Sequence, residues 1–257
     1  MRNHLVCLVA ITLGLAVENV TGGGNGKKTD GVIPPGFTPL FNGKDFTGWK
    51  VPAGDNGHWK ILPGGIIDYD AKSEAKGDKS LWTEKSYKDF VLMADWRLKT
   101  DKGYPNKVPH ILPDGTHKIG DDGKEIRIDI EDVDSGIYLR GSPDSQVNIW
   151  MWPIGSGEVY GYRTNKKHPP EVRAAVTPKK KMDRPRGQWN TFVITMKGDR
   201  LWVKLNGEEV ISNAQLPGVP REGPFALQHH GGWNAKTKQW TGPPSLVQFR
   251  NLWIKEL

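Results

Sequence analysis

Short runs of alternating apolar and polar residues recur along most of the chain and are separated by turn residues. In the run DFVLMADWRLK (89–99), every second side chain from Phe90 to Leu98 is apolar. Such alternation predicts a β-strand with one buried face, because successive side chains on a strand point to opposite sides. The polar face of this strand then carries Asp95 and Arg97.

The run LWVKLNGEEVIS (201–212) predicts a β-hairpin. Its Asn206-Gly207 pair supplies the positive φ angles that a type I′ turn requires. A further alternating run, QWNTFVITMK (188–197), is joined to it by Gly198-Asp199. We therefore expect three consecutive antiparallel strands.

Four more runs carry polar side chains at alternate positions. They are SGIYLRG (135–141), QVNIWMW (146–152), GEVYGYR (157–163) and GPFALQHHGG (223–232). As strands they would present these residues on their polar faces: Tyr138 and Arg140; Gln146, Asn148 and Trp150; Glu158, Tyr160 and Tyr162; Gln228 and His230. Since adjacent strand residues face opposite sides, His229 is expected on the packing side of its strand.

The composition agrees with a soluble domain of short strands and many turns. Hydrophobic residues make up 36% of the 257 positions, and there are 31 glycines and 19 prolines, which argues against long helices. Chains of this length often form a single all-β domain. We expect one domain over 37–257, preceded by a Gly-rich linker over 21–36.

The N-terminus has the pattern of a secretory signal. MRNHLVCLVAITLGLAV places Arg2 before an apolar run that is short for a bilayer span. Residues 1–20 are expected to be a signal peptide, the mature protein to be exported to the periplasm or beyond, and no transmembrane span to remain in it. Cys7, the single cysteine, lies in this segment, so the mature chain would have no disulfide or thiolate chemistry.

The net charge of +7 raises the question of a nucleic-acid partner. The densest basic stretch, TPKKKMDRPRGQW (177–189), contains prolines and a glycine but no aromatic residue before its end, which is typical of a solvated loop. We expect no nucleic-acid partner. The chain also lacks the common motifs of serine hydrolases, nucleotide-binding proteins and zinc proteases.

Seven motifs, in order, carry a family resemblance: GFTPLFNGKDFTGW, SYKDFVLMADWRL, SGIYLRG, SGEVYGY, QWNTFVITMKGDRLWVKLNGEEV, GPFALQHHGG and VQFRNLWIKEL. From about Phe37 to Leu257 the chain resembles the 3-keto-disaccharide hydrolase family. The resemblance implies an all-β fold, a concanavalin A-like jelly-roll β-sandwich of two antiparallel sheets. It also implies a carbohydrate substrate, a disaccharide or glycoside already oxidised to a ketone at C3.

The chemistry of such a cleavage defines what the site must contain. The ketone acidifies the proton on C2, so a base that removes it yields an enolate, and the glycosidic oxygen on C1 can then leave by elimination. Addition of water completes a net hydrolysis. The site therefore needs a base, donors for the C3 oxygen and an acid for the leaving group. An imidazole is suited to the base role near neutral pH.

The candidates divide by role. The catalytic candidates are His230 as the first choice for the base, with Asp95 and Glu158 as carboxylate alternatives. The substrate-binding candidates are Arg97, Arg140, Tyr138, Asn148, Gln228 and Trp150. We expect Asp95, Arg97, Arg140 and His230 to share one surface.

Departures from the family pattern keep other hypotheses open. Gln146 and Asn148 stand where a glutamate and a glutamine are common, and His229 where an aspartate is common. These changes favour the alternative of a non-catalytic, lectin-like carbohydrate-binding module; a basic cell-envelope adhesion protein is a third hypothesis. The long segment 101–134 could be a specificity loop. Its DIEDVD stretch (129–134) could hold a divalent metal ion, although a solvated acidic turn is favoured, so the cofactor requirement stays open.

Overall fold

The core of the protein is a sandwich of two antiparallel β-sheets. The computed structural model describes residues 31–257, of which Ile33–Leu257 forms one unit. The predicted signal peptide and most of the predicted linker lie outside the described residues. Within the described range, no helix is long and apolar enough to cross a membrane. The expected all-β sandwich of two antiparallel sheets is confirmed.

The larger sheet has eight strands. Its order is β13 (Glu208–Gln215), β12 (Arg200–Leu205), β11 (Asn190–Lys197), β6 (Phe90–Leu98), β17 (Val247–Glu256), β4 (Ile66–Tyr69) and β3 (Lys60–Leu62), and β1 (Thr38–Pro39) also pairs with β17. The predicted run of three strands is present as β11, β12 and β13. Asn206 and Gly207 have φ angles of 55° and 90°, as a type I′ turn requires.

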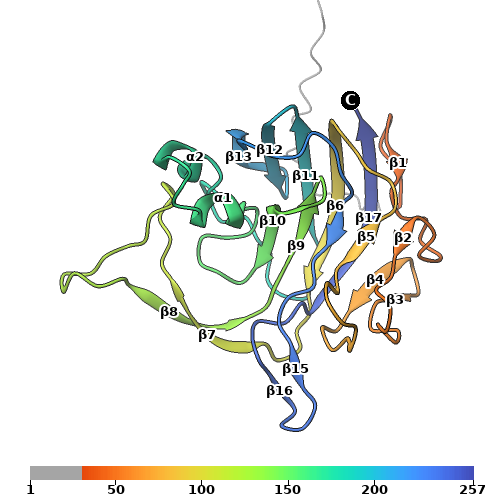
Figure 1. The fold of residues 1–257 in the computed structure, drawn as a ribbon, viewed down its shortest axis with the longest axis horizontal. Helices are drawn as coiled ribbons and strands as arrows, with labels where there is room; N and C mark the ends of the chain where they lie inside the picture. The colour runs from red at the N-terminus through yellow and green to blue at the C-terminus, as the bar shows by residue number, and fades with distance from the viewer. Residues whose placement is uncertain (1–30) are drawn as a thin grey trace, which may run out of the picture. The chain divides into compact units, whose positions relative to one another are not determined.

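The smaller sheet has five strands. Its order is β10 (Ser142–Trp150), β9 (Asp134–Leu139), β14 (Ala226–Leu227), β5 (Leu81–Thr83) and β2 (Trp49–Lys50). Two separate ribbons complete the strands: β7 (Tyr104–Pro109) with β8 (Arg127–Asp132), and β15 (Trp233–Asn234) with β16 (Gln239–Trp240). Figure 1 shows the β7–β8 ribbon leading to a long arm on the left and the β15–β16 hairpin at the bottom.

Alternating side chains from both sheets fill the space between them. Trp96 of β6 packs against Phe192 of β11, with ring centroids 5.3 Å apart, and both are almost fully buried. From the smaller sheet, Ile137 and Val147 belong to the same core. Burying each such side chain contributes roughly 1.5–3 kcal/mol. The core therefore fixes which faces of β9 and β10 point outward.

The GEVYGYR segment departs from its predicted strand. Val159 makes a single bridge to β10, and the chain then forms α1 (Tyr160–Thr164) and, further on, α2 (Pro170–Ala175). The helical turn brings Nε of Arg163 to 2.7 Å from Oε1 of Glu158. Because an unpaired buried carboxylate is costly, this pairing favours a helical turn over continued alternation.

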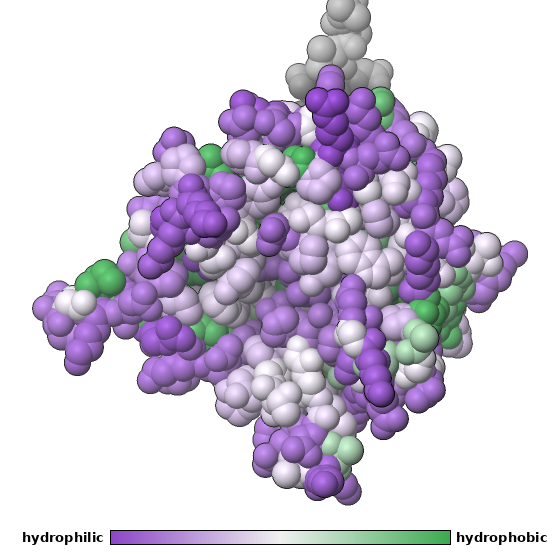
Figure 2. Space-filling model, viewed as in Figure 1, coloured by the Kyte–Doolittle hydropathy of each residue, from purple (hydrophilic) through white to green (hydrophobic). Residues whose placement is uncertain are grey.

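Few large hydrophobic side chains are exposed among the described residues. Figure 2 shows a mainly hydrophilic face on which hydrophobic atoms occupy small, separate areas. The large hydrophobic side chains that are exposed are scattered, namely Val32, Ile33, Val51, Ile119, Tyr160 and Leu257. Scattered exposed hydrophobic residues are common on protein surfaces and do not by themselves mark a site.

Candidate functional site

A cavity of about 360 Å³ lies on the outer face of the smaller sheet, a volume within the usual range for ligand sites. Strand alternation builds its floor, because every second residue of β9 and β10 points outward. The residues that line it are Asn106, Asp132, Asp134, Gln146, Asn148, Trp150, Trp152, Tyr160, Gln228, His230 and Pro243. The predicted outward face of β10 is therefore confirmed.

The HHGG motif shapes one wall of this cavity. Nδ1 of His230 lies 2.7 Å from the carbonyl oxygen of Pro243. A carbonyl can only accept, so Nδ1 carries a proton, and in the neutral ring the lone pair is then on Nε2. Gly231 permits this contact, since its φ is 76° and a Cβ there would lie 2.5 Å from the Pro243 oxygen. The glycine thus lets the returning chain come close enough to hold the imidazole.

His229 points to the other side of the strand, as alternation predicts. Its Nδ1 lies 2.8 Å from the hydroxyl of Tyr69, a core residue. Burial lowers the pKa of His229 to about 4, so the ring is neutral at pH 7. We assign it a packing role.

Two glutamine side chains cross the floor of the cavity. Nε2 of Gln146 donates to Oε1 of Gln228 at 2.6 Å and to the carbonyl of Ser135 at 3.1 Å. Gly136 leaves room for this arrangement, because a Cβ there would lie 2.4 Å from Nε2 of Gln146. With its Oε1 bonded to Gln146, Gln228 keeps its Nε2 as a donor for other groups or a ligand.

Two aspartates, Asp132, which is buried, and Asp134, which is partly exposed, meet the cavity where β8 ends and β9 begins. Oδ2 of Asp132 accepts hydrogen bonds from Asn106 at 2.8 Å and from Nε1 of Trp152 at 3.0 Å. Oδ1 of Asp132, of Asp134 and of Asn148 is buried without a hydrogen-bond partner among the described residues. Burial raises the pKa of Asp134 to about 7 and raises that of Asp132 as well. Because orphaned acceptors are costly, these atoms suit a ligand that brings hydroxyl donors.

An aromatic pair forms a further wall. The rings of Trp150 and Trp152 stack with centroids 4.3 Å apart and planes within 3°. Trp150 is buried, and its Nε1 donates to the carbonyl of Gly155 at 2.6 Å, whereas Trp152 is partly exposed. A flat apolar ring beside polar acceptors matches the two-sided chemistry of a sugar.

Glu158 lies behind the cavity rather than in its wall. Its backbone pairs with that of Asn148, its side chain is fully buried, and burial raises its pKa to about 7 even though Arg163 lowers it. Nη1 of Arg163 lies 3.4 Å from Nε2 of His117, whose Nδ1 is 2.8 Å from Oε1 of Glu125. These contacts connect Glu158 to the arm between β7 and β8.

The structure does not bring Asp95 and Arg97 to this cavity, which corrects the expectation of one shared surface. Both lie on the outer face of β6, in the larger sheet. Asp95 accepts from Thr191 at 2.6 Å and from Asn251 at 2.8 Å, and Nε of Arg97 donates to Gln248 at 2.7 Å. Alternation correctly predicted an outward face, but it carries no information on which sheet a strand joins.

Arg140 is also away from the cavity, at a corner of the fold. It is buried with a φ of 50°, and its guanidinium donates to the carbonyls of Lys88 at 2.7 Å and Gly198 at 2.7 Å and pairs with Asp89 at 3.0 Å. Alternation fails here because Arg140 follows the last residue of β9. These contacts join three chain segments, which is a structural role.

Tyr138 lies on the same outer face of the smaller sheet as the cavity, next to the residues that line it. It is opposite Gln146 on β10 and beside Trp82, with ring centroids 5.6 Å apart. Burial raises the pKa of Tyr138 to about 12, so its hydroxyl stays protonated. The predicted residues that the structure brings together on this face are His230, Asn148, Gln228, Trp150 and Tyr138.

Sequence reasoning missed several site residues. Asp134 lies four residues before Tyr138 and therefore on the same face of the strand. Extending the alternation from Tyr138 back to residue 134 would have found it. Alternation placed Gln146 on the polar face of its strand, although Gln146 was not among the candidates, whereas Asp132 and Asn106 belong to the β7–β8 ribbon, outside the runs for which alternation predicted polar faces. The DIEDVD stretch does not form a ligand cluster: within the described range, no three His, Cys, Asp or Glu side chains come together as metal ligands do.

Solved structures share the fold of this chain. A candidate glycosyl hydrolase from Parabacteroides distasonis ATCC 8503 matches with a TM-score of 0.56 and 19% identity, over 87% of this chain and 85% of its own. A second one from the same organism has a TM-score of 0.52 and 19% identity, over 86% and 94%. The carbohydrate binding module CBM66 from Bacillus subtilis is more distant, with a TM-score of 0.41 and 16% identity over 81% and 96%. No curated protein matches the sequence.

Fold and site together define a two-sheet antiparallel β-sandwich with a polar cavity on the outer face of its smaller sheet. More particularly, the chain belongs to the family described as the 3-keto-alpha-glucoside-1,2-lyase-like domain, whose model matches residues 36–255. The family membership expected from the seven motifs is confirmed.

Proposed function

We propose that the protein cleaves glycosides whose sugar carries a ketone at C3, by elimination across C1 and C2 followed by hydration. The observation that carries this proposal is the pairing, around one cavity, of an imidazole whose Nδ1 donates to a carbonyl, so that Nε2 has the lone pair in the neutral ring, with a carboxyl whose pKa is raised to about 7 by burial. A base and an acid are the two groups the elimination requires. The family description as a 1,2-lyase-like domain supports the same reaction type.

His230 acts as the base in this proposal. Nε2 removes the proton from C2, and the electron pair of that C–H bond forms the enolate of the C3 ketone. Because Nδ1 donates to the carbonyl of Pro243, the imidazolium that results is held in place and stabilised by an acceptor. Asp95 is too far removed, on the other sheet, to take this role.

Asp134 acts as the acid. When the enolate collapses, C1=C2 forms, the bond from C1 to the glycosidic oxygen breaks, and that oxygen takes the proton of Asp134. Water then adds its oxygen to C1, returning a proton to Asp134, and His230, whose Nε2 proton exchanges with solvent as the water enters, gives a proton to C2. The balance is a net hydrolysis that leaves both groups in their starting states.

Amide donors, rather than a guanidinium, stabilise the enolate. No lysine or arginine lines the cavity in the described part of the chain. Arg97 and Arg140, the arginines expected to bind the substrate, are therefore not the donors to the enolate oxygen. Nε2 of Gln228 is the proposed donor to the C3 oxygen, since Gln146 holds its Oε1 at 2.6 Å. Oδ1 of Asn148 would accept from a sugar hydroxyl, and Trp152 would pack against the ring.

The test is a product assay with a panel of 3-keto disaccharides and 3-keto glucosides beside their unoxidised parents. We expect release of the free 3-keto sugar from the oxidised members alone. Turnover of the parents at an equal rate would contradict the proposal. The matched variants are His230→Ala, which should lose turnover, and Lys236→Gln, an exposed change away from the cavity, which should keep it.

A carbohydrate-binding module without catalysis is the second candidate. The observation in its favour is the neutral character of much of the cavity, where Gln146, Gln228, Asn148 and the tryptophan pair are groups that bind sugars without reacting. The same panel separates the two hypotheses. Saturable binding with no product from any member would support the module.

A further inference from the structure

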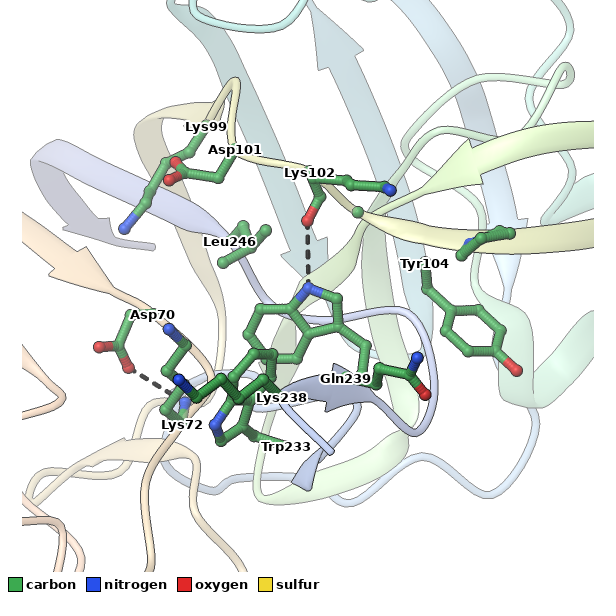
Figure 3. Close-up of a pocket in the computed structure, with 13 residues that line it drawn as sticks. Asp70, Lys72, Lys99, Asp101, Lys102, Tyr104, Trp233, Lys238, Gln239 and Leu246 are labelled. Carbon is green, nitrogen blue, oxygen red and sulfur yellow. Dashed lines mark hydrogen bonds between the residues drawn. The ribbon is translucent and has the colours of Figure 1, made fainter. Parts of the chain in front are cut away.

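A second hollow, of about 560 Å³, lies beside the β15–β16 hairpin (Figure 3). Its walls are Trp233 and residues 238–240 of the hairpin together with side chains from the segments 70–72 and 99–105, and we call it the lysine groove. The mechanism proposed above uses none of its side chains. Its volume lies in the usual range for ligand sites.

The lysine groove carries an excess of positive charge. Four lysines and two aspartates line it, and one of the aspartates is already bonded to a histidine at 2.8 Å. Lys99 is paired with Asp68 at 3.1 Å. No carboxylate of the described residues forms an ion pair with Lys72, Lys102 or Lys238. These three ammonium groups are available to an anion.

Two tryptophans give the groove a flat apolar surface. Trp233 and Trp240 meet with ring centroids 4.7 Å apart at 61°, and Nε1 of Trp240 donates to the carbonyl of Lys102 at 3.1 Å. Nζ of Lys72 lies 4.5 Å from the centroid of Trp233 and 5.8 Å from that of Trp240, and Lys238 is another of the side chains that line the groove (Figure 3). Ring and cations together match a ligand that has an apolar face and a negative group.

The lysine groove and the cavity are neighbours along the chain on both sides. Pro105 lines the groove and the next residue, Asn106, lines the cavity. On the other side, two glycines separate His230 in the cavity from Trp233 in the groove. The two hollows therefore border the same two chain segments.

We propose that the lysine groove binds an anionic saccharide unit, which carries a carboxylate or a sulfate, as a second subsite for a ligand whose other end occupies the cavity. The anion pairs with Lys72 and Lys238, and the apolar face of the sugar packs against the tryptophan pair. That the cavity end is a reacting sugar rests on the proposed function, whereas binding in the groove does not.

The test is a calorimetric titration of the full chain with oligogalacturonate, with a sulfated galacto-oligosaccharide and with the neutral galacto-oligosaccharide. We expect an anionic member to bind, to weaken as salt is added, and to bind at least tenfold more tightly than the neutral one. The double variant Lys72→Gln/Lys238→Gln should weaken it about tenfold, since exposed ion pairs contribute up to about 1 kcal/mol each. Lys236→Gln, on the same hairpin but outside the groove, is the matched control.

Comparing the ligands shows which anionic group the lysine groove binds, and further outcomes decide whether the proposal holds. Binding of the galacturonate alone assigns a carboxylate, and binding of the sulfated sugar alone assigns a sulfate. Equal binding of the neutral sugar, an unchanged affinity in the double lysine variant, or equal competition by a glutamate-rich peptide would overturn the proposal. The variant His230→Ala should still bind the anionic saccharide in the lysine groove. If the protein binds this saccharide but turns over no 3-keto substrate, the proposed reaction is contradicted and the proposed subsite is not.

Discussion

The outer faces of the two sheets carry similar polar residues but use them in opposite ways. On the larger sheet, both carboxylate oxygens of Asp95 are bonded and Arg97 donates to Gln248. On the smaller sheet, Asp134 and Asn148 each keep a buried oxygen without a partner among the described residues. The first face is a satisfied network, whereas the second keeps capacity for a ligand.

The difference shows that residue type and strand parity do not identify a site. A polar face that satisfies its own groups stabilises the fold, because each bond made avoids the cost of a buried unpaired group. A face that leaves such groups unpaired around a cavity accepts that cost, which is a common feature of functional sites. Substitutions on the two faces should therefore change different quantities.

The largest effect is expected from His230→Ala. Loss of a general base typically lowers turnover by about 10²- to 10⁴-fold, and the imidazole makes one side-chain hydrogen bond, to Pro243, so the protein should remain folded. The measurement is kcat on the best 3-keto substrate, with thermal unfolding as the check on folding. Turnover within a few-fold of the natural protein would remove His230 from the mechanism.

Asp134→Asn should change the pH dependence of the rate. Since Asp134 has a pKa of about 7 and acts when protonated, kcat should fall about tenfold per pH unit above that value. The Asn variant should be slower and should lack this alkaline decline. An unchanged alkaline decline in the variant would assign it to another group.

The same carboxyl should leave a signature in stability. Its folded pKa of about 7 lies above the value of about 3.9 in unfolded chains. The folded state therefore holds a proton that the unfolded state has released, and its contribution to stability declines as the pH rises from about 4 to about 7. Thermal unfolding over this range should show a smaller decline in Asp134→Asn. Parallel curves for the two proteins would contradict the pKa assignment.

The substitution Gly231→Ala tests how the chain around the cavity of the smaller sheet holds the imidazole of His230. The substitution needs a positive φ and places a Cβ 2.5 Å from the oxygen of Pro243, so we expect a loss of roughly 1–3 kcal/mol of stability and lower turnover as the imidazole shifts. Gly207→Ala is the control, because it has a φ of 90° and no neighbour within 4 Å. It should lose stability and keep turnover.

The smallest effect on activity is expected from Asp95→Ala. The change leaves Thr191 and Asn251 without their acceptor, which should reduce the free energy of unfolding by about 1–3 kcal/mol. Turnover per folded molecule should stay the same. A large loss of kcat with no change in unfolding would move the site to the larger sheet.

Much of the fold could be predicted from the sequence because its signals are local. Alternation predicted β6 and the outward face of β10, and Asn206-Gly207 predicted the β12–β13 turn. The site depends on longer-range facts. Whether Asp95 and His230 share a surface depends on the order of strands in the sheets. The orientation of His230 depends on Pro243, thirteen residues later. The helical turn after Glu158 depends on the pairing of its buried carboxyl group with Arg163.

The most direct test of the account is cleavage of a 3-keto disaccharide in D2O with rapid quenching, followed by mass and NMR analysis of the sugar released. Elimination and rehydration through His230 predict enzyme-dependent incorporation of deuterium at C2 of the product, absent in His230→Ala and in the reaction without protein. Release of product that retains hydrogen at C2 would contradict the mechanism and favour direct displacement at C1.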